Sequence, residues 1–162
     1  RCFMITRYPT SDDHELVLIN SHMSAYDKGG TSRAQQLALL TKIMSEERAK
    51  GNYVIAGGDW NHAISGSLTL YPSVQQVPDW VAELKDSDLP EGFSVVAPDK
   101  LTNVPTCRGD DIPYEKDKTY TTTVDGWIVS DNVVATARNI DTQFAYSDHN
   151  PVLLSFTLKS KE

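Results

Sequence analysis

Two short, continuously apolar segments constrain the fold of this chain most strongly. Leu16-Val17-Leu18-Ile19 and Tyr53-Val54-Ile55-Ala56 each place four apolar residues in a row and are followed closely by polar or glycine residues. Apolar runs of this length without alternation are typical of strands that are buried on both faces. The chain is therefore expected to contain a sheet whose two faces are both covered by other parts of the structure.

A helix is predicted between these strands, over residues 32–50. Ser32 and Gln35 match a capping box, in which each side chain bonds a free N–H group of the first turn. Apolar residues then recur at helical spacing on one face (Leu37, Leu40 and Met44). Gly51-Asn52 supplies the stop signal.

The rest of the chain is mostly strands and loops. Strands are predicted over residues 2–6, 15–20, 120–124, 127–130, 133–138 and 152–158. Residues 62–118 form a long irregular stretch, with one short helix predicted over residues 79–85. This mixture predicts an α/β (α+β) layered structure in a single domain, residues 1–162.

The charge balance limits the partners of the chain. Acidic residues outnumber basic ones by 22 to 15, which gives a net charge of -7. A strong nonspecific grip on nucleic acid requires Lys and Arg to release counterions, so the composition argues against one. A nuclease is still allowed, because a local basic rim or bound metal ions can offset carboxylates.

The cysteines and the ends of the chain say little about its location. Cys2 and Cys107 lack the CxxC spacing of a thiolate zinc site, and two unpaired thiols are favoured over a disulfide. No apolar stretch reaches the roughly 20 residues that span a bilayer, and no leader opens the chain. Arg1 lies at the start of a predicted strand, which suggests a piece of a longer protein and leaves localisation unassigned.

Four polar clusters stand at the ends of predicted strands. They are Asn20-Ser21-His22, Gly58-Asp59-Trp60-Asn61, Asp125-Gly126 and Ser147-Asp148-His149. Strand ends are where a rigid scaffold presents functional side chains on loops. Each cluster can therefore be interpreted either as part of a functional site or as an ordinary turn or loop at a strand end.

Two of these clusters combine groups that suit phosphate or metal chemistry. Asp59 and Asn61 point to the same side of an extended backbone, where they can orient a water and hold a phosphate oxygen or a hard cation. The alternative is a turn, since Gly, Asp and Asn are turn residues. Asp148 offers a hard ligand next to His149, an acid/base group near neutral pH, and the alternative is a polar loop.

The other two clusters need partners. Asp125 is flanked by apolar strand residues, so its carboxylate is costly to bury alone, and a histidine is an obvious partner. The alternative is an Asp-Gly hairpin turn. His22 follows an apolar strand, where a lone histidine is more often structural.

The order of these clusters is more specific than any one of them. The chain carries Asn-x-His, then Gly-Asp-x-Asn, then Asp before an aromatic-aliphatic strand, then Ser-Asp-His-x-Pro-Val. This series resembles the second half of the endonuclease/exonuclease/phosphatase superfamily, from about Ile5 to Leu158. That superfamily includes deoxyribonucleases, apurinic-site endonucleases, neutral sphingomyelinases and inositol polyphosphate 5-phosphatases.

The resemblance implies a role for each residue. His22 is similar to the histidine that hydrogen-bonds the scissile phosphate. Asp59 is similar to the carboxylate that orients the attacking water, and Asn61 to the amide that binds phosphate or metal.

The remaining roles concern charge. Asp125 is similar to the partner of His149, and His149 to the group that stabilises the phosphorane-like transition state. Asp148 is similar to a metal ligand, so the implied metal residues are Asp148, Asp59 and Asn61, and the implied cofactor is Mg²⁺ or Mn²⁺. Metal and imidazolium would offset charge on the phosphoryl oxygens.

The chain also departs from the family pattern. Trp60 stands where the family usually carries Phe. The family takes an Asn and a metal-binding Glu from its first half, and no such segment precedes Arg1. The implied fold is the C-terminal half of a four-layer sandwich, whose inner sheet face is exposed unless the missing N-terminal half or a second copy covers it.

The resemblance implies a divalent-metal-dependent phosphoesterase, and the breadth of the family favours phosphodiester over phosphomonoester hydrolysis. The expected substrate is a phosphate ester from nucleic acid or from a lipid or inositol phosphate. The chain alone is expected to bind Mg²⁺ weakly and to have little or no activity. The alternative is a non-catalytic binding module, against which the presence of every key residue argues.

Overall fold

The computed structural model describes residues 1–98 and 104–159 and is built around one five-stranded sheet. In spatial order its strands are β1 (Phe3–Pro9), β2 (Glu15–His22), β3 (Tyr53–Asp59), β9 (Asp125–Ser130) and β6 (Phe93–Val96). The neighbours β2 and β3 are parallel, and the other pairs are antiparallel. A parallel pair needs a crossover, and helix α1 (Thr31–Ala49) supplies it.

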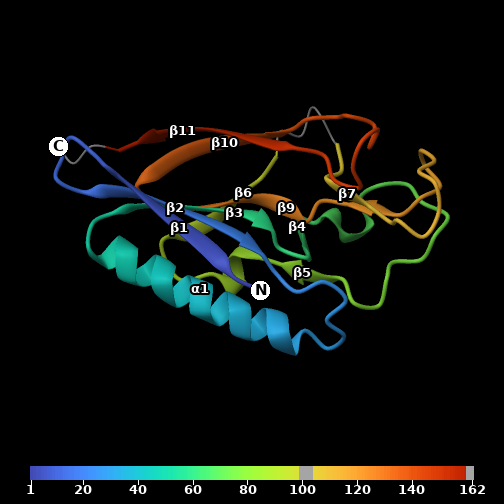
Figure 1. Cartoon of the computed structure of the whole chain (residues 1–162), viewed down its shortest axis with the longest axis horizontal. Helices are drawn as coiled ribbons and strands as arrows, with labels where there is room; N and C mark the ends of the chain where they lie inside the picture. Colours follow the sequence, from blue (N-terminus) through green and yellow to red (C-terminus); the bar gives the residue numbers. More distant parts are fainter. Residues whose placement is uncertain (99–103, 160–162) are drawn as a thin grey trace.

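Both faces of this sheet are covered, as the two apolar segments require. Figure 1 shows α1 on one face, and on the other the pair β10 (Val133–Asn139) and β11 (Val152–Leu158). Alternate strand residues supply the two cores: Val17 packs with Leu40 and Met44 on the helix side, and Ile55 packs on the β10–β11 side. The predicted mixed α/β class is confirmed.

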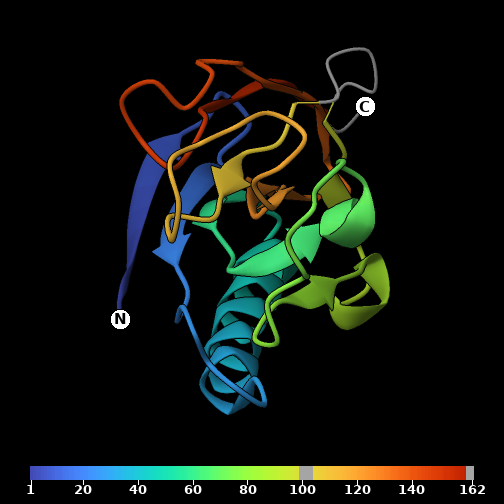
Figure 2. The ribbon, with the colours of Figure 1, turned by 90° about the vertical axis from the view of Figure 1, so that its right-hand side faces the viewer.

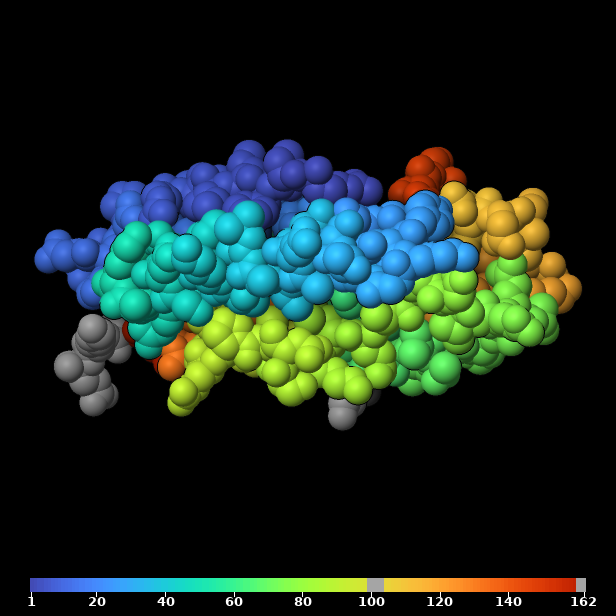
Figure 3. All heavy atoms as spheres, turned by 90° about the horizontal axis from the view of Figure 1, so that it is seen from below, coloured from blue at the N-terminus to red at the C-terminus, as the bar shows by residue number. Residues whose placement is uncertain are grey.

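The short elements gather at one end and one edge of the sheet. Figure 2 views the end at which β2 and β3 stop, and Figure 3 shows α1 between β1 and the segment that follows β3. These elements are β4 (His62–Ile64), η1 (Ser67–Thr69), β5 (Ala82–Leu84), η2 (Asp86–Asp88), β7 (Cys107–Arg108) and β8 (Thr121–Thr122). Of these elements, β7 and β8 contribute residues to the lining of the candidate site, namely Cys107, Arg108 and Thr122.

The predicted helix over residues 79–85 is wrong. Residues Ala82–Leu84 form strand β5, which pairs in parallel with β4 and buries Leu84. A helix of two turns has too few backbone bonds to be stable alone, so pairing with β4 decides the structure. The stretch 62–118 also contains β6, which had been assigned to irregular structure, while residues 99–103 lie outside the described residues.

Two further local predictions fail. The capping box is absent: Gly30 is the N-cap of α1, and the Asp27 carboxylate accepts the Arg33 N–H at 2.8 Å. The strand predicted over residues 120–124 is reduced to β8, because only that dipeptide finds a partner strand, β7. Other strand ends move by a few residues, most at β1, which continues to Pro9.

The inner sheet face, which was expected to be exposed, is covered in part. The β10–β11 pair covers the centre of that face, where Tyr53, Ile55 and Val129 are buried. On the same face, Met4 and Tyr8 of β1 and Asn20 of β2 are exposed. No helix in residues 1–98 and 104–159 is both long and apolar enough to cross a membrane.

Glu47 ties α1 to β1 and gives a testable contribution to stability. Its carboxylate accepts two hydrogen bonds from Arg7, at 2.7 and 2.8 Å, and one from Asn52 at 2.9 Å. We expect Glu47→Gln to lower the free energy of unfolding by about 1–3 kcal/mol at neutral pH, because hydrogen bonds to a charged group are lost in a buried place. Urea denaturation measures it, with the exposed Glu46→Gln as control.

The pH dependence of this difference follows from the pKa of Glu47. Arg7, followed by Lys50 and Asn52, lowers that pKa from 4.5 to about 2. A depressed folded-state pKa stabilises the protein above the unfolded value and loses this effect as pH falls. The gap between the native protein and Glu47→Gln should therefore close between pH 4.5 and about 2. A gap that stays constant over that range would contradict the assignment.

Candidate active site

Three adjacent strands place His22, Asp59 and Asp125 in one row. His22 ends β2, Asp59 ends β3 and Asp125 begins β9. The strand register pairs His22 with Asp59, and Asp59 with Asp125. Residues directly opposite one another on neighbouring strands share a face, so the three side chains meet. Nε2 of His22 lies 3.3 Å from Oδ2 of Asp59.

His149 joins this row from the loop between β10 and β11. Its Nδ1 lies 2.7 Å from Oδ2 of Asp125, and its Nε2 lies 4.0 Å from Oδ2 of Asp59. The predicted Asp125–His149 hydrogen bond is present, with the imidazole donating. Asp125 belongs to a strand, so the hairpin-turn interpretation is wrong.

The electrostatics of this group favour a charged imidazolium at His149 and raise the pKa of the neighbouring Asp59 carboxylate. The hydrogen bond to Asp125, with a further contribution from Cys107, raises the pKa of His149 to about 11. His149 is therefore protonated at neutral pH. Burial and then the charge of Asp125 raise the pKa of Asp59 above its ordinary range. Asp59 is thus a better proton acceptor than an exposed aspartate.

Asn61 is fixed by a turn that starts at Asp59. Its backbone has a φ of 48°, which asparagine tolerates well, and its N–H donates to Oδ1 of Asp59 at 2.8 Å. Its Nδ2 donates to the carbonyl of Met23 at 3.0 Å. The turn interpretation is therefore correct, and this same turn places the Asn61 amide beside the Asp59 carboxylate.

The glycine and the tryptophan around Asp59 have structural roles. Gly58 has a φ of 143°, and a Cβ there would lie 1.8 Å from the carbonyl oxygen of Ser21. Only glycine allows β2 and β3 to approach this closely. Trp60 is fully buried, and its Nε1 donates to the carbonyl of Gly126 at 3.2 Å.

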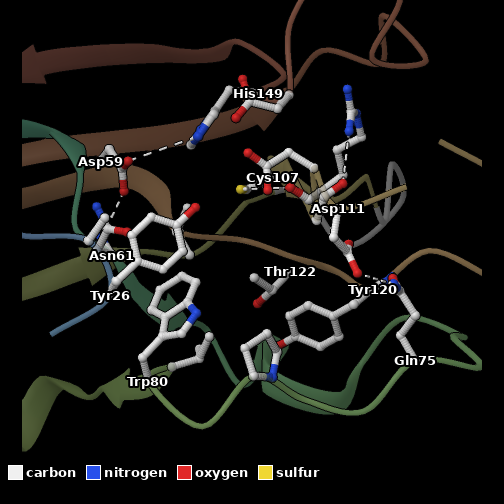
Figure 4. Close-up of a pocket in the computed structure, with 18 of the residues that line it drawn as sticks. Tyr26, Asp59, Asn61, Gln75, Trp80, Cys107, Asp111, Tyr120, Thr122 and His149 are labelled. Atoms are coloured by element: carbon white, nitrogen blue, oxygen red, sulfur yellow. Dashed lines mark hydrogen bonds and ion pairs between the residues drawn. The ribbon is translucent and has the colours of Figure 1, made fainter. Parts of the chain in front are cut away.

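These side chains open onto a pocket of about 380 Å³, of which Figure 4 gives a close view. Its lining includes His22, Asp59, Asn61, Asp148 and His149. Asp125 does not line this pocket and is connected to it by its hydrogen bond with His149. The residues singled out in the sequence are therefore brought together at one site, although they come from segments far apart in the chain.

Asp148 is placed less tightly than the others. It is exposed, and its carbonyl accepts the Arg108 N–H at 3.0 Å. Among the described residues, the closest group of candidate ligand atoms belongs to Asp59, Asp125 and His149, which lie within 4.8 Å of one another. Asp148 is outside this group, although it lines the pocket.

The available donors fit a hard cation. Asp59, Asp148 and the amide oxygen of Asn61 offer oxygen ligands, which Mg²⁺ and Mn²⁺ prefer. His149 is unsuitable as a ligand, because Nδ1 is bonded to Asp125 and the ring is protonated at neutral pH. The oxygen donors that line the pocket beside His149 and could be offered to a cation include Asp59, Asn61 and Asp148.

Several supporting residues carry no sequence signal. The Thr106 hydroxyl accepts the N–H of Asp125 at 3.0 Å and so fixes the start of β9. Asn150 is buried, and its side chain donates to the Pro105 carbonyl at 2.9 Å, which braces the loop of His149. Cys107 pairs with His149 in a β-bridge, and both Cys2 and Cys107 are free thiols.

Comparisons with known proteins identify the fold. No protein-family model and no curated protein matches the chain. Among solved structures, D. rerio TDP2 complexed with single strand DNA product matches with a TM-score of 0.61 and 18% identity, over 96% of this chain and 61% of that one. An endonuclease/exonuclease/phosphatase family protein from Bacteroides thetaiotaomicron matches with a TM-score of 0.53 and 19% identity, over 93% and 52%.

A third structure is ANGEL2, a 2',3'-cyclic phosphatase, in complex with adenosine-2',3'-vanadate. It matches with a TM-score of 0.55 and 17% identity, over 99% of this chain and 67% of that one. The resemblance found in the sequence is confirmed at the level of the fold, and identities this low establish nothing finer. The chain spans between 52% and 67% of the length of these three structures.

Proposed function

We propose that this chain, which has the fold of endonuclease/exonuclease/phosphatase proteins, carries most of the active centre of a metal-dependent phosphodiesterase. The observation that carries the proposal is the row of His22, Asp59 and Asp125, completed by His149. This arrangement places a proton acceptor, Asp59, and a fixed positive charge, the His149 imidazolium, on one wall of the pocket. Hydrolysis of a phosphodiester needs both, because a water must lose a proton while negative charge grows on phosphoryl oxygens.

Each side chain has a role in this proposal. Asp59 orients the attacking water and accepts its proton, and the Asn61 amide holds a phosphoryl oxygen or the metal. His22 donates a hydrogen bond to a second phosphoryl oxygen. These groups act from rigid strand ends, so they are positioned before the substrate binds.

The positive charges complete the mechanism. His149 stabilises the charge that develops on phosphorus oxygens, and Asp125 keeps the imidazole charged and oriented. A cation at Asp59, Asn61 and Asp148 would supply Lewis-acid polarisation of the phosphoryl group. The family draws a further Glu ligand from its first half, so we propose that these residues alone bind Mg²⁺ weakly and that sequence outside the chain completes a four-layer sandwich.

The metal role of Asp148 can be tested separately from the chemistry. We expect Asp148→Asn to raise the Mn²⁺ dissociation constant on the order of tenfold or more, because one of two anionic ligands is lost. Titration calorimetry measures this, and the half-maximal Mg²⁺ concentration for activity should rise in parallel. Asp110→Asn, a carboxylate in the same pocket, is the matched control. Equal metal affinities in the two variants would exclude Asp148 as a ligand.

The substrate is proposed to be nucleic acid, which is what one structural neighbour carries. The D. rerio TDP2 structure contains single strand DNA product, and the ANGEL2 structure contains adenosine-2',3'-vanadate. The complete protein should be assayed in Mg²⁺ against single-stranded oligonucleotides, sphingomyelin and inositol phosphates. Cleavage of oligonucleotides above the others supports the proposal. Binding of oligonucleotides without cleavage in any metal would favour the non-catalytic binding module.

A further inference from the structure

The candidate pocket has an aromatic wall beside its catalytic end. Tyr26 precedes α1 and Trp80 precedes β5, and their ring centroids lie 5.2 Å apart at an interplanar angle of 65°. Figure 4 shows both rings next to Asn61, with Asp59 and His149 farther up the pocket. A ligand whose phosphate lies at Asp59 therefore presents its neighbouring group to these rings.

Neither ring is needed for the described hydrophobic cores. Tyr26 is 66% exposed, Trp80 is half-buried, and both are outside the two core clusters. Both rings line the pocket. Large aromatic rings left open to a pocket provide contact area with little conformational entropy to lose, which suits ligand binding.

Arg33 connects this wall to the catalytic turn. It is 1% exposed, and Nη1 donates to the carbonyl of Asn61 at 3.1 Å. Nη2 donates to the carbonyls of Trp80 at 2.6 Å and Asp27 at 3.2 Å. Its guanidinium carbon also lies 6.0 Å from the centre of the Trp80 ring. The buried Arg33 guanidinium thus holds three loops in a fixed arrangement, namely those that contain Tyr26, Asn61 and Trp80.

The rest of the lining distinguishes between planar and aliphatic ligands. Gln76, Asp110 and Asp111 line the same pocket. An acyl chain there would take carboxylates and an amide out of water without replacing their hydrogen bonds. A nucleobase stacks on the rings and carries N–H donors that those acceptors can bond.

We infer that Tyr26 and Trp80 form a subsite for the nucleobase next to the scissile phosphate, and that Arg33 is the positioning residue that fixes this subsite relative to Asn61. The inference rests on the proposed function and narrows its substrate class to nucleotides whose base is unpaired. A paired base is stacked within its duplex and does not reach a wall of this kind without unstacking.

Binding measurements test the subsite without any turnover. Adenosine 5′-monophosphate should bind the complete protein about 5- to 100-fold more tightly than ribose 5-phosphate, which is the range expected for stacking one base. Tyr26→Ala and Trp80→Ala should remove most of this difference, while Tyr26→Phe keeps it. The control is Tyr8→Ala, a partly exposed tyrosine on β1 that does not line the pocket.

Two results would overturn the subsite. The first is a nucleotide preference that survives both Tyr26→Ala and Trp80→Ala. The second is tighter binding of a short-chain diacylglycerol phosphate than of the nucleotide, which would assign the wall to a lipid. A protein that shows the base preference but cleaves no phosphodiester would refute the proposed function and leave the subsite standing.

Cleavage assays test Arg33 separately. Tyr26→Ala should act mainly through KM: it should raise KM for a single-stranded oligonucleotide toward that for the same strand with an abasic site beside the scissile phosphate, and change KM for the abasic strand little. Arg33→Lys keeps the charge but loses the fork, so it should lower kcat as well as the base preference, because Asn61 shifts together with the wall. A folded Arg33→Lys protein with native kcat and native base preference would refute the positioning role. If Arg33→Lys fails to fold, Arg33→Gln, which keeps two N–H donors, is judged by the same readout.

Discussion

Asp59→Asn should lower kcat for phosphodiester hydrolysis by about 10³- to 10⁴-fold, the upper range for loss of a general base. The substitution keeps the shape of the side chain, so the hydrogen bond from the Asn61 N–H to Oδ1 can remain. It removes the negative charge that accepts the proton of the attacking water. Single-turnover kinetics at saturating Mg²⁺ isolate this loss from a change in metal affinity.

The control for this experiment is Asp131→Asn, a similar change at the far end of β9. Asp131 is paired with Arg48 and does not line the pocket. Its kcat should match that of the native protein. An Asp59→Asn protein that is folded, binds Mg²⁺ and retains native kcat would exclude Asp59 as the proton acceptor.

Asp125→Asn should lower kcat by roughly 10²- to 10⁴-fold at alkaline pH and by less at acidic pH. The hydrogen bond to Asp125 is the largest cause of the raised pKa of His149, which otherwise lies near 6.5. A raised pKa keeps the imidazolium present up to that value, so the native ring is charged across the neutral range. Without the carboxylate, the ring loses its proton as pH rises through its ordinary pKa.

The pH profile is therefore the decisive readout for Asp125. The ratio of native to Asp125→Asn kcat should grow as pH rises from about 5.5 to 8.5, on either side of the ordinary pKa of histidine. NMR titration of the His149 ring should show a lower pKa in the variant. A ratio that stays constant across this range would mean that Asp125 does not act through the charge of His149.

The sequence singled out the residues that meet at the candidate site because they follow strands in a recognisable order. The local spacing of Asp59 and Asn61, and of Asp148 and His149, left a turn or a polar loop as the alternative, and it was the order of the clusters along the chain that made them candidates. The cost of burying a lone carboxylate predicted a histidine partner for Asp125, and the family resemblance implied that this partner is His149. Strand register then explains why these residues meet, since His22, Asp59 and Asp125 are direct neighbours across the sheet.

The supporting residues could not be predicted because their contacts join distant segments. Arg33 holds the carbonyls of Asn61 and Trp80, and no periodic pattern relates these three positions. Thr106 fixes Asp125 in the same way, through a contact across the fold. Predictions from local sequence rules also failed where a contact from outside the motif satisfied the same group. At the start of α1, the Asp27 carboxylate accepts a backbone N–H of the first turn, and the predicted capping box does not form.

The most direct test of the central claim is the Mg²⁺ dependence of phosphodiester hydrolysis by the complete protein and by Asp59→Asn, measured side by side. The native protein should turn over a single-stranded oligonucleotide at a rate that rises with Mg²⁺ and disappears with a chelator, and Asp59→Asn should show no comparable rate at any Mg²⁺ concentration. Turnover that persists without divalent metal, or equal rates in the two proteins, would contradict a metal-dependent phosphodiesterase centred on Asp59.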